Sequence, residues 1–202
     1  DEYPQIKSVV WCPGTGNVGF NALGKVFSGE VNPSGKTPDT FVYDMTTAPW
    51  WNNAEKTEYT NLADMAVEGM KAGNAQVYAP AFTNYVEGIY VGYKYYETAA
   101  QEGAIDYDKT VQYPFGYGLS YTEFEQKMGE LEEKDGQISV DVEVTNTGDV
   151  AGKDVVEVYY NPPYTNGGIE KASANLIEFA KTDLLQPGDS QTVTVTFDVE
   201  DM

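Results

Sequence analysis

The 202-residue chain contains neither arginine nor histidine, and Cys12 is its only cysteine. All twelve basic residues are therefore lysines. Without histidine the chain lacks the usual general base at neutral pH and the commonest metal ligand. Without arginine it lacks the planar fork that binds phosphate and carboxylate groups through two parallel hydrogen bonds. Any chemistry must come from Asp, Glu, Tyr, Lys, Ser or the single cysteine.

Long apolar runs are also missing, and the charge is strongly one-sided. No stretch approaches the roughly 18 apolar residues of a transmembrane helix, and the first five residues lack the basic and apolar parts of a signal peptide. The 32 acidic residues give a formal net charge of −20, which argues against nucleic acid and membrane as partners. A single cysteine fits a reducing compartment, so we expect a cytoplasmic location, with a secreted or periplasmic one as the alternative.

The first 43 residues carry three short patterned segments. An apolar run over 6–12, ended by a Pro-Gly pair, predicts a buried parallel strand and a turn, with Cys12 as a core side chain. The spacing of apolar residues over 21–28 predicts a short helix that Gly29 ends. Residues 40–43 predict a second short extended piece.

The middle of the chain is less regular. Periodicity weakens over 44–81, which predicts a long loop or insertion with a possible helix at 62–71. Ten of the sixteen tyrosines lie between Tyr78 and Tyr121. That density predicts irregular chain packed by aromatic rings whose hydroxyls stay hydrated or hydrogen-bonded.

After Phe124 apolar and polar residues alternate cleanly. The alternation predicts strands at 138–144, 155–160, 175–180 and 193–199, separated by turn signals. Strands with one apolar face predict an antiparallel β-sandwich. The sequence therefore predicts a mixed α+β fold whose sandwich begins near 121–127.

Two sets of residues suggest a chemical site. The glycines of Gly14-Thr-Gly-Asn-Val-Gly19 follow a predicted strand and precede a predicted helix, which matches the dinucleotide-binding fingerprint, although a tight turn explains them more simply. Glycoside hydrolysis needs a pair of carboxyl groups, and Asp106, Asp108 and Glu130-Leu-Glu-Glu133 all lie in polar surroundings typical of solvated surface. Glu87 lies among aromatic residues, where a buried acid that accepts a hydrogen bond from a tyrosine hydroxyl or a backbone amide is the commoner outcome.

Aromatic residues supply a candidate sugar-binding group. Trp50 and Trp51 could stack on sugar faces, or could pack as a plug on their own domain. Ser28 and Ser120 have no histidine to activate them as nucleophiles. No set of ligands has metal-binding spacing, so we expect neither a metal nor another cofactor.

Three blocks carry a family resemblance: Gly29-Glu-Val-Asn-Pro-Ser-Gly-Lys36, Glu87-Gly-Ile-Tyr-Val-Gly-Tyr-Lys-Tyr-Tyr96 and Tyr113-Pro-Phe-Gly-Tyr-Gly-Leu-Ser-Tyr121. Together with Val144-Thr-Asn-Thr-Gly-Asp-Val-Ala-Gly152 they resemble the C-terminal half of family 3 glycoside hydrolases, which include many bacterial β-glucosidases. The implied division is 1–43 as the end of an α/β-sandwich domain, 44–124 as a long loop and aromatic-rich connector, and 125–202 as a fibronectin type III-like β-sandwich, incomplete at its C-terminus.

The resemblance also implies where the chemistry lies. Family members use a retaining mechanism, with an aspartate nucleophile on a barrel domain and a glutamate acid/base earlier in the α/β sandwich, and neither motif occurs in this chain. A family turn that reads Pro-Gly-Gln-Glu-Gly-Gly is here Pro13-Gly-Thr-Gly-Asn-Val-Gly19, so the role of its acid does not carry over. No catalytic residue is therefore assigned.

We expect the chain to be a non-catalytic portion of a retaining β-glucosidase-type enzyme that is inactive alone. Its roles would be scaffold and, through Trp50 and Trp51, rim of the substrate pocket. The barrel domain of the same protein would be its partner, and a β-glucoside or oligosaccharide the substrate of the whole enzyme. The alternative is a free-standing carbohydrate-binding or adhesion module, and a nucleotide-binding protein is a third possibility.

Overall fold

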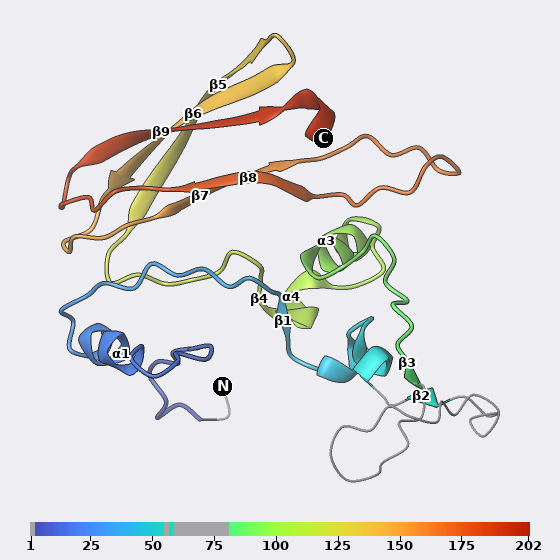
Figure 1. The fold of residues 1–202 in the computed structure, drawn as a ribbon, viewed down its shortest axis with the longest axis horizontal. Helices are drawn as coiled ribbons and strands as arrows, with labels where there is room; N and C mark the ends of the chain where they lie inside the picture. Colours follow the sequence, from blue (N-terminus) through green and yellow to red (C-terminus); the bar gives the residue numbers. More distant parts are fainter. Residues whose placement is uncertain (1–2, 55–56, 59–80) are drawn as a thin grey trace, which may run out of the picture.

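The computed structural model describes residues 3–54, 57–58 and 81–202, and it shows a β-sandwich beside a layer of short helices and short two-stranded sheets (Figure 1). Helical elements are α1 (Phe20–Phe27), η1 (Met45–Thr47), η2 (Trp51–Ala54), α3 (Tyr93–Gln101), α4 (Tyr107–Thr110) and η3 (Val199–Asp201). Strands are β1 (Phe41–Val42), β2 (Thr57–Glu58), β3 (Ala81–Phe82), β4 (Val111–Tyr113), β5 (Phe124–Lys134), β6 (Gln137–Asn146), β7 (Val155–Tyr160), β8 (Asn175–Lys181) and β9 (Ser190–Asp198). The mixed α+β fold is as predicted.

The sandwich consists of a three-stranded antiparallel sheet, β5-β6-β9, facing the antiparallel pair β7-β8. The register sets Val140 opposite Val195 and Val142 opposite Val193, so alternate residues of β6 and β9 share the inner face. The buried core contains Val140, Val142, Val144, Val156, Leu185, Val193 and Val195. The alternating pattern therefore predicted these strands correctly.

Strand β5 was missed because its sequence is polar. It pairs with β6 through a tight turn at Asp135 and Gly136, both with positive φ (54° and 83°), and the carboxylates of 130–133 are exposed as expected. Met128 and Leu131 lie opposite buried β6 valines yet remain 63% and 60% exposed. The inner face of the sandwich is thus uncovered at Met128 and Leu131, whereas Phe124 at the start of β5 packs against the core.

The first segment agrees with the predictions only in part. Helix α1 and strand β1 form as expected, and Gly29 (φ 77°) ends α1 with its N–H bonded to the carbonyl of Val26. The strand predicted at 6–12 does not form, and Cys12 is exposed and not a core residue. A strand needs a neighbour to bond its N–H and C=O groups, and none of the described strands pairs with this segment.

The tyrosine-rich stretch is helical at 93–101, not irregular as predicted. Gly92 (φ 59°) turns the chain sharply into α3, and Tyr96 of that helix is buried with Val42 of β1 and Val111 of β4. The helix predicted at 62–71 lies outside the described residues. In the part of the chain that the structure describes, no helix is long and apolar enough to cross a membrane.

Tyr96 leads to a prediction about alkaline pH. It is 2% exposed, and burial raises the pKa of its phenol to about 12. Because this pKa lies above the usual value, the stability contributed by the protonated phenol is complete below about pH 10 and is lost as pH rises through 12. We expect Tyr96→Phe to reduce the fall in melting temperature over this range. The 77%-exposed Tyr85, changed to Phe, is the control; equal falls in both variants would contradict the prediction.

Candidate functional site

The two tryptophans of the predicted sugar-binding pair differ in their surroundings. Their ring centroids are 6.5 Å apart with planes tilted by 49°, so the rings do not form one flat platform. Trp50 is half-buried, whereas Trp51 is 39% exposed. Trp51 is thus the more exposed of the two tryptophans.

Hydrogen bonds fix the turn that carries these rings. The N–H of Asn53 donates to the carbonyl of Trp50 at 2.9 Å, closing a 3-10 turn. Residues three apart eclipse one another in such a turn, so Asn53 lies on the side of Trp50, not of Trp51. Its side-chain Nδ2 donates to Oε2 of the half-buried Glu87 at 2.7 Å. Glu87 is therefore bound by a side-chain amide, where a tyrosine hydroxyl or a backbone amide was expected.

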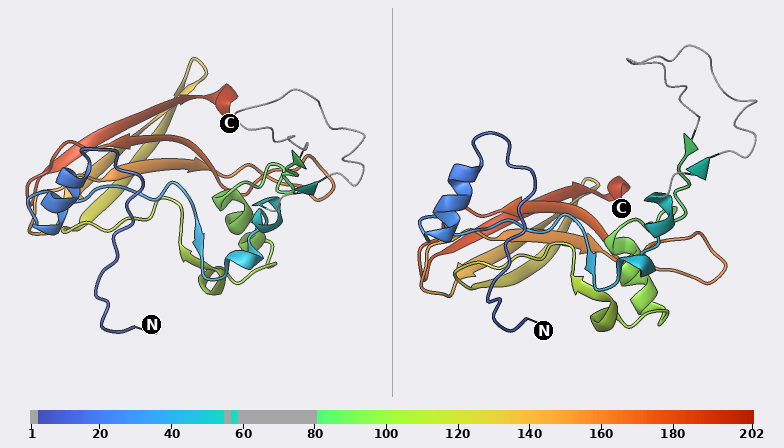
Figure 2. Two further views of the ribbon diagram at one scale, coloured as in Figure 1. Left: turned by 60° about the horizontal axis from the view of Figure 1, so that its bottom comes forward. Right: turned by 90° about the horizontal axis from the view of Figure 1, so that it is seen from below.

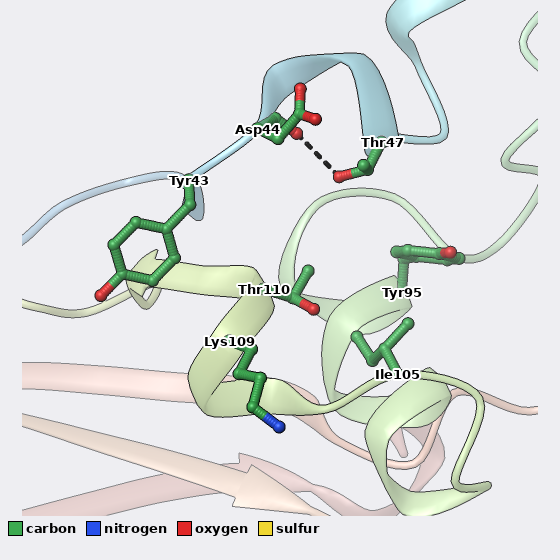
Figure 3. Close-up of a pocket in the computed structure, with 7 residues that line it drawn as sticks. All are labelled: Tyr43, Asp44, Thr47, Tyr95, Ile105, Lys109 and Thr110. Atoms are coloured by element: carbon green, nitrogen blue, oxygen red, sulfur yellow. Dashed lines mark hydrogen bonds between the residues drawn. The ribbon is translucent and has the colours of Figure 1, made fainter.

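A hollow of about 220 Å³ lies beside this region, between η1, α3 and α4 (Figure 3). The Asp44 carboxylate accepts hydrogen bonds from the hydroxyl and N–H of Thr46 at 2.7 and 2.9 Å, and the hydroxyl bond above all lowers its pKa. The Thr47 hydroxyl donates to the Asp44 carbonyl at 2.7 Å. Asp44 and Thr47 are thus engaged in local bonds, and Asp44 is an ionised cap of η1, unsuited to donate a proton. The lining residues are Tyr43, Asp44, Thr47, Tyr95, Ile105, Lys109 and Thr110.

The other candidate groups are structural. Asp106 is exposed and bonded to Lys109 at 2.5 Å, an interaction that lowers the pKa of Asp106 and raises that of Lys109. The glycine-rich turn at 14–19 is not preceded by a strand and leads into a helix of only eight residues, so the context of a dinucleotide site is missing. No group of three potential metal ligands occurs among the described residues.

Asn32 joins three segments that are far apart in the sequence. Its Nδ2 donates to the carbonyl of Ala151 at 3.1 Å, and its Oδ1 accepts from the Ser120 hydroxyl at 2.9 Å and the Tyr121 N–H at 2.8 Å. The Tyr121 hydroxyl donates in turn to the carbonyl of Val26 in α1 at 2.9 Å. We call this meeting of residues 32–37, 114–122 and 151–154 the seam.

Glycines and lysines close the seam. A methyl group on Gly118 would lie 2.1 Å from the carbonyl oxygen of Gly35, so the two backbones approach too closely for any side chain there. Lys36 forms an ion pair with Asp154 at 3.3 Å, and Lys181 donates to the carbonyl of Ser34 at 2.9 Å. The sequence blocks 29–36 and 113–121, which carry the family resemblance, therefore face each other across the seam.

Aromatic contacts link the seam to α3. The ring of Tyr93 lies 4.8 Å from Phe115 and 5.8 Å, edge-on, from Tyr159 of β7. Its hydroxyl accepts the N–H of Leu176 in β8 at 2.7 Å. The sequence showed a dense cluster of tyrosines but gave no sign that Tyr93 contacts β7 and β8, whose partner residues lie 66 and 83 residues away.

Comparison with known proteins agrees with this architecture. Residues 154–202 match the fibronectin type III-like domain family. A β-glucosidase of Ruminococcus albus is 36% identical over 197 residues, which are 96% of this chain and 17% of that protein. Butyrivibrio fibrisolvens β-glucosidase A is 36% identical over 213 residues, 98% of this chain and 22% of its own length.

Solved structures give the same result. A β-glucosidase from Paenibacillus barengoltzii superposes with a TM-score of 0.69 and 37% identity, over 90% of this chain and 17% of that one. The family 3 (GH3) β-glucosidase of Bifidobacterium adolescentis superposes with a TM-score of 0.64 and 29% identity, over 91% of this chain and 23% of that one. The chain thus spans about a fifth of the length of the proteins it matches. It corresponds to a C-terminal portion of family 3 (GH3) β-glucosidases, and its residues 154–202 match the fibronectin type III-like domain.

Proposed function

We propose that this chain is a non-catalytic portion of a retaining β-glucosidase-type enzyme, acting as scaffold and as part of the rim of the substrate pocket. The observation that carries the proposal is the alignment of nearly the whole chain with about a fifth of each β-glucosidase. The described carboxylates that were considered for catalysis are solvated or engaged in structural bonds. The exposed ring of Trp51 supplies the rim.

Exposed apolar surface supports the scaffold role. The segment before α1 has no strand partner among the described residues and exposes the apolar side chains of Val9 and Trp11 by 76% and 53%. Phe20 of α1 is 68% exposed. Apolar exposure of this extent is typical of an interface. We propose that these residues contact the remainder of an α/β-sandwich domain. The uncovered Met128 and Leu131 support the further proposal that the fibronectin-like sandwich is completed by strands outside these 202 residues.

Titration calorimetry of the chain with gluco-oligosaccharides tests the proposal against the alternative of a free-standing carbohydrate-binding module. One exposed aromatic ring contributes about 1 kcal/mol, far less than the roughly 4 kcal/mol needed for a millimolar dissociation constant. We therefore expect no measurable heat. Submillimolar binding that disappears in Trp51→Ala but persists in Trp11→Ala would favour the module. Trp11 is a matched control because it is also an exposed tryptophan.

A further inference from the structure

The segment between β7 and β8, residues 161–174, forms an arm that leaves the sandwich on the side of α3 (Figures 1 and 2). The arm is braced internally, since Asn161 Nδ2 donates to the carbonyl of Ser173 at 2.5 Å and Lys171 Nζ to that of Pro163 at 3.1 Å. It is also fixed to α3, because the Ser173 N–H donates to the Thr98 hydroxyl at 2.9 Å. The arm is therefore a supported extension of the sandwich.

A single β-turn touches both this arm and the tryptophan segment. The N–H of Tyr90 donates to the carbonyl of Glu87 at 3.0 Å, which closes the turn, and Gly88 within it has a φ of 58°. On one side the Tyr90 hydroxyl donates to the carboxylate of Glu170 in the arm. On the other side the Glu87 carboxylate accepts the Asn53 amide at 2.7 Å. Only two residues, Gly88 and Ile89, thus separate Tyr90, which contacts the arm, from Glu87, which contacts η2.

We infer that Glu87 and Tyr90 are positioning residues through which the arm of the fibronectin-like sandwich holds η2 and keeps the ring of Trp51 presented. Asn53 is bound on the side of the turn that carries Trp50, so the bond to Glu87 anchors the inner face of η2 and leaves the outer ring open. The two tryptophans consequently have separate roles, Trp50 in the anchor and Trp51 in the contact surface. The purpose of this arrangement rests on the proposed rim function.

Amide hydrogen exchange in the 202-residue chain tests the inference without any sugar. The N–H groups of Trp51 and Asn53 are bonded within the turn, to the carbonyls of Ala48 and Trp50, so their exchange reports its opening. We expect Glu87→Ala to speed their exchange about fivefold, as loss of one hydrogen bond predicts. Glu87→Gln should restore slow exchange because an amide oxygen accepts the same bond.

Matched variants separate positioning from general loss of stability. Glu102→Ala removes an exposed carboxylate at the end of α3 and should leave exchange in η2 unchanged. Asn53→Ala removes the same hydrogen bond from the side of η2. If Glu87→Ala does not fold, faster exchange of the Trp51 amide in Asn53→Ala supports the inference and unchanged exchange overturns it. Tyr90→Phe should speed exchange about twofold, whereas Tyr85→Phe should not.

Equal exchange in the Glu87→Ala and Glu102→Ala variants would overturn the inference. If Glu87→Ala speeds exchange of the Trp51 and Asn53 amides but Tyr90→Phe does not, the role of the arm in holding η2 is overturned. Failure of the rim function is a different result: in the complete enzyme Trp51→Ala would then leave KM for a β-glucoside unchanged, while the exchange pattern in the 202-residue chain stayed as expected.

Discussion

Replacement of Asn146 by alanine is expected to lower the free energy of unfolding of the fibronectin-like sandwich by about 3 kcal/mol. The Asn146 side chain is fully buried, and its Nδ2 donates to the carbonyls of Val150 and Leu185 at 2.8 and 3.0 Å. Its Oδ1 accepts from the Thr122 hydroxyl at 2.7 Å and the Gly148 N–H at 3.2 Å. Alanine would leave these groups unpaired in the interior, where each unpaired group is costly.

Urea denaturation monitored by circular dichroism measures this loss. Asn166 is an exposed asparagine of the arm, so Asn166→Ala should change stability by less than about 0.5 kcal/mol. The two variants make the same chemical change in buried and exposed positions. A loss in Asn146→Ala no larger than in Asn166→Ala would show that the buried network does not stabilise the sandwich.

Replacement of Gly118 by alanine is expected to open the seam at a cost of about 3 kcal/mol, the upper part of the range for overpacking. The new methyl group would lie 2.1 Å from the carbonyl oxygen of Gly35, and a backbone group cannot move aside as a side chain can. The nearby ion pair between Lys36 and Asp154 and the hydrogen bond from Asn32 to Ala151 would have to break. Gly35→Ala is the matched control, because a methyl group there has no neighbour within 4 Å.

Limited digestion by trypsin measures this opening at Lys36. Its side chain is 26% exposed and held by Asp154 and by the carbonyl of Gly118 at 3.2 Å. Cleavage after Lys36 should accelerate strongly in Gly118→Ala and remain slow in Gly35→Ala. Equal cleavage rates in the two variants would contradict the tight approach of the backbones at the seam.

The predicted sandwich strands formed because their pattern is local. Alternation of period two over 138–144 and 193–199 fixes which side chains turn inward, and the turn at Gly188 (φ 83°) suits a left-handed conformation. Strand β5 has no such alternation. It forms because the adjacent β6 supplies hydrogen-bonding partners, which is a tertiary effect.

The errors have the same physical origin. The run at 6–12 is apolar enough for a buried strand, yet a strand depends on neighbours that the described chain does not supply. Helix α3 was hidden by aromatic residues, which are weak helix formers, and is stabilised by packing Tyr96 against Val42 and Val111. The absence of a described pairing strand at 6–12 and the presence of packing partners at α3 therefore determined the secondary structure.

The candidate site could be predicted as residue types but not as geometry. Trp50 and Trp51 are identical in chemistry, and only the 3-10 turn and the bond from Asn53 to Glu87 distinguish them. Asn32 could be recognised from the sequence only as part of a family block. Its partners lie 88 to 119 residues away, a distance over which sequence patterning carries no information.

The most direct test of the account is turnover of an aryl β-glucoside by the purified 202-residue chain. We propose that the nucleophile and the acid/base lie in parts of the enzyme outside this chain, so release of the aryl group should equal the rate without protein. The Glu87→Gln variant, which keeps the bond to Asn53, should give the same baseline. Turnover by the chain that Glu87→Gln abolishes would contradict the account, because it would place the chemistry within these residues.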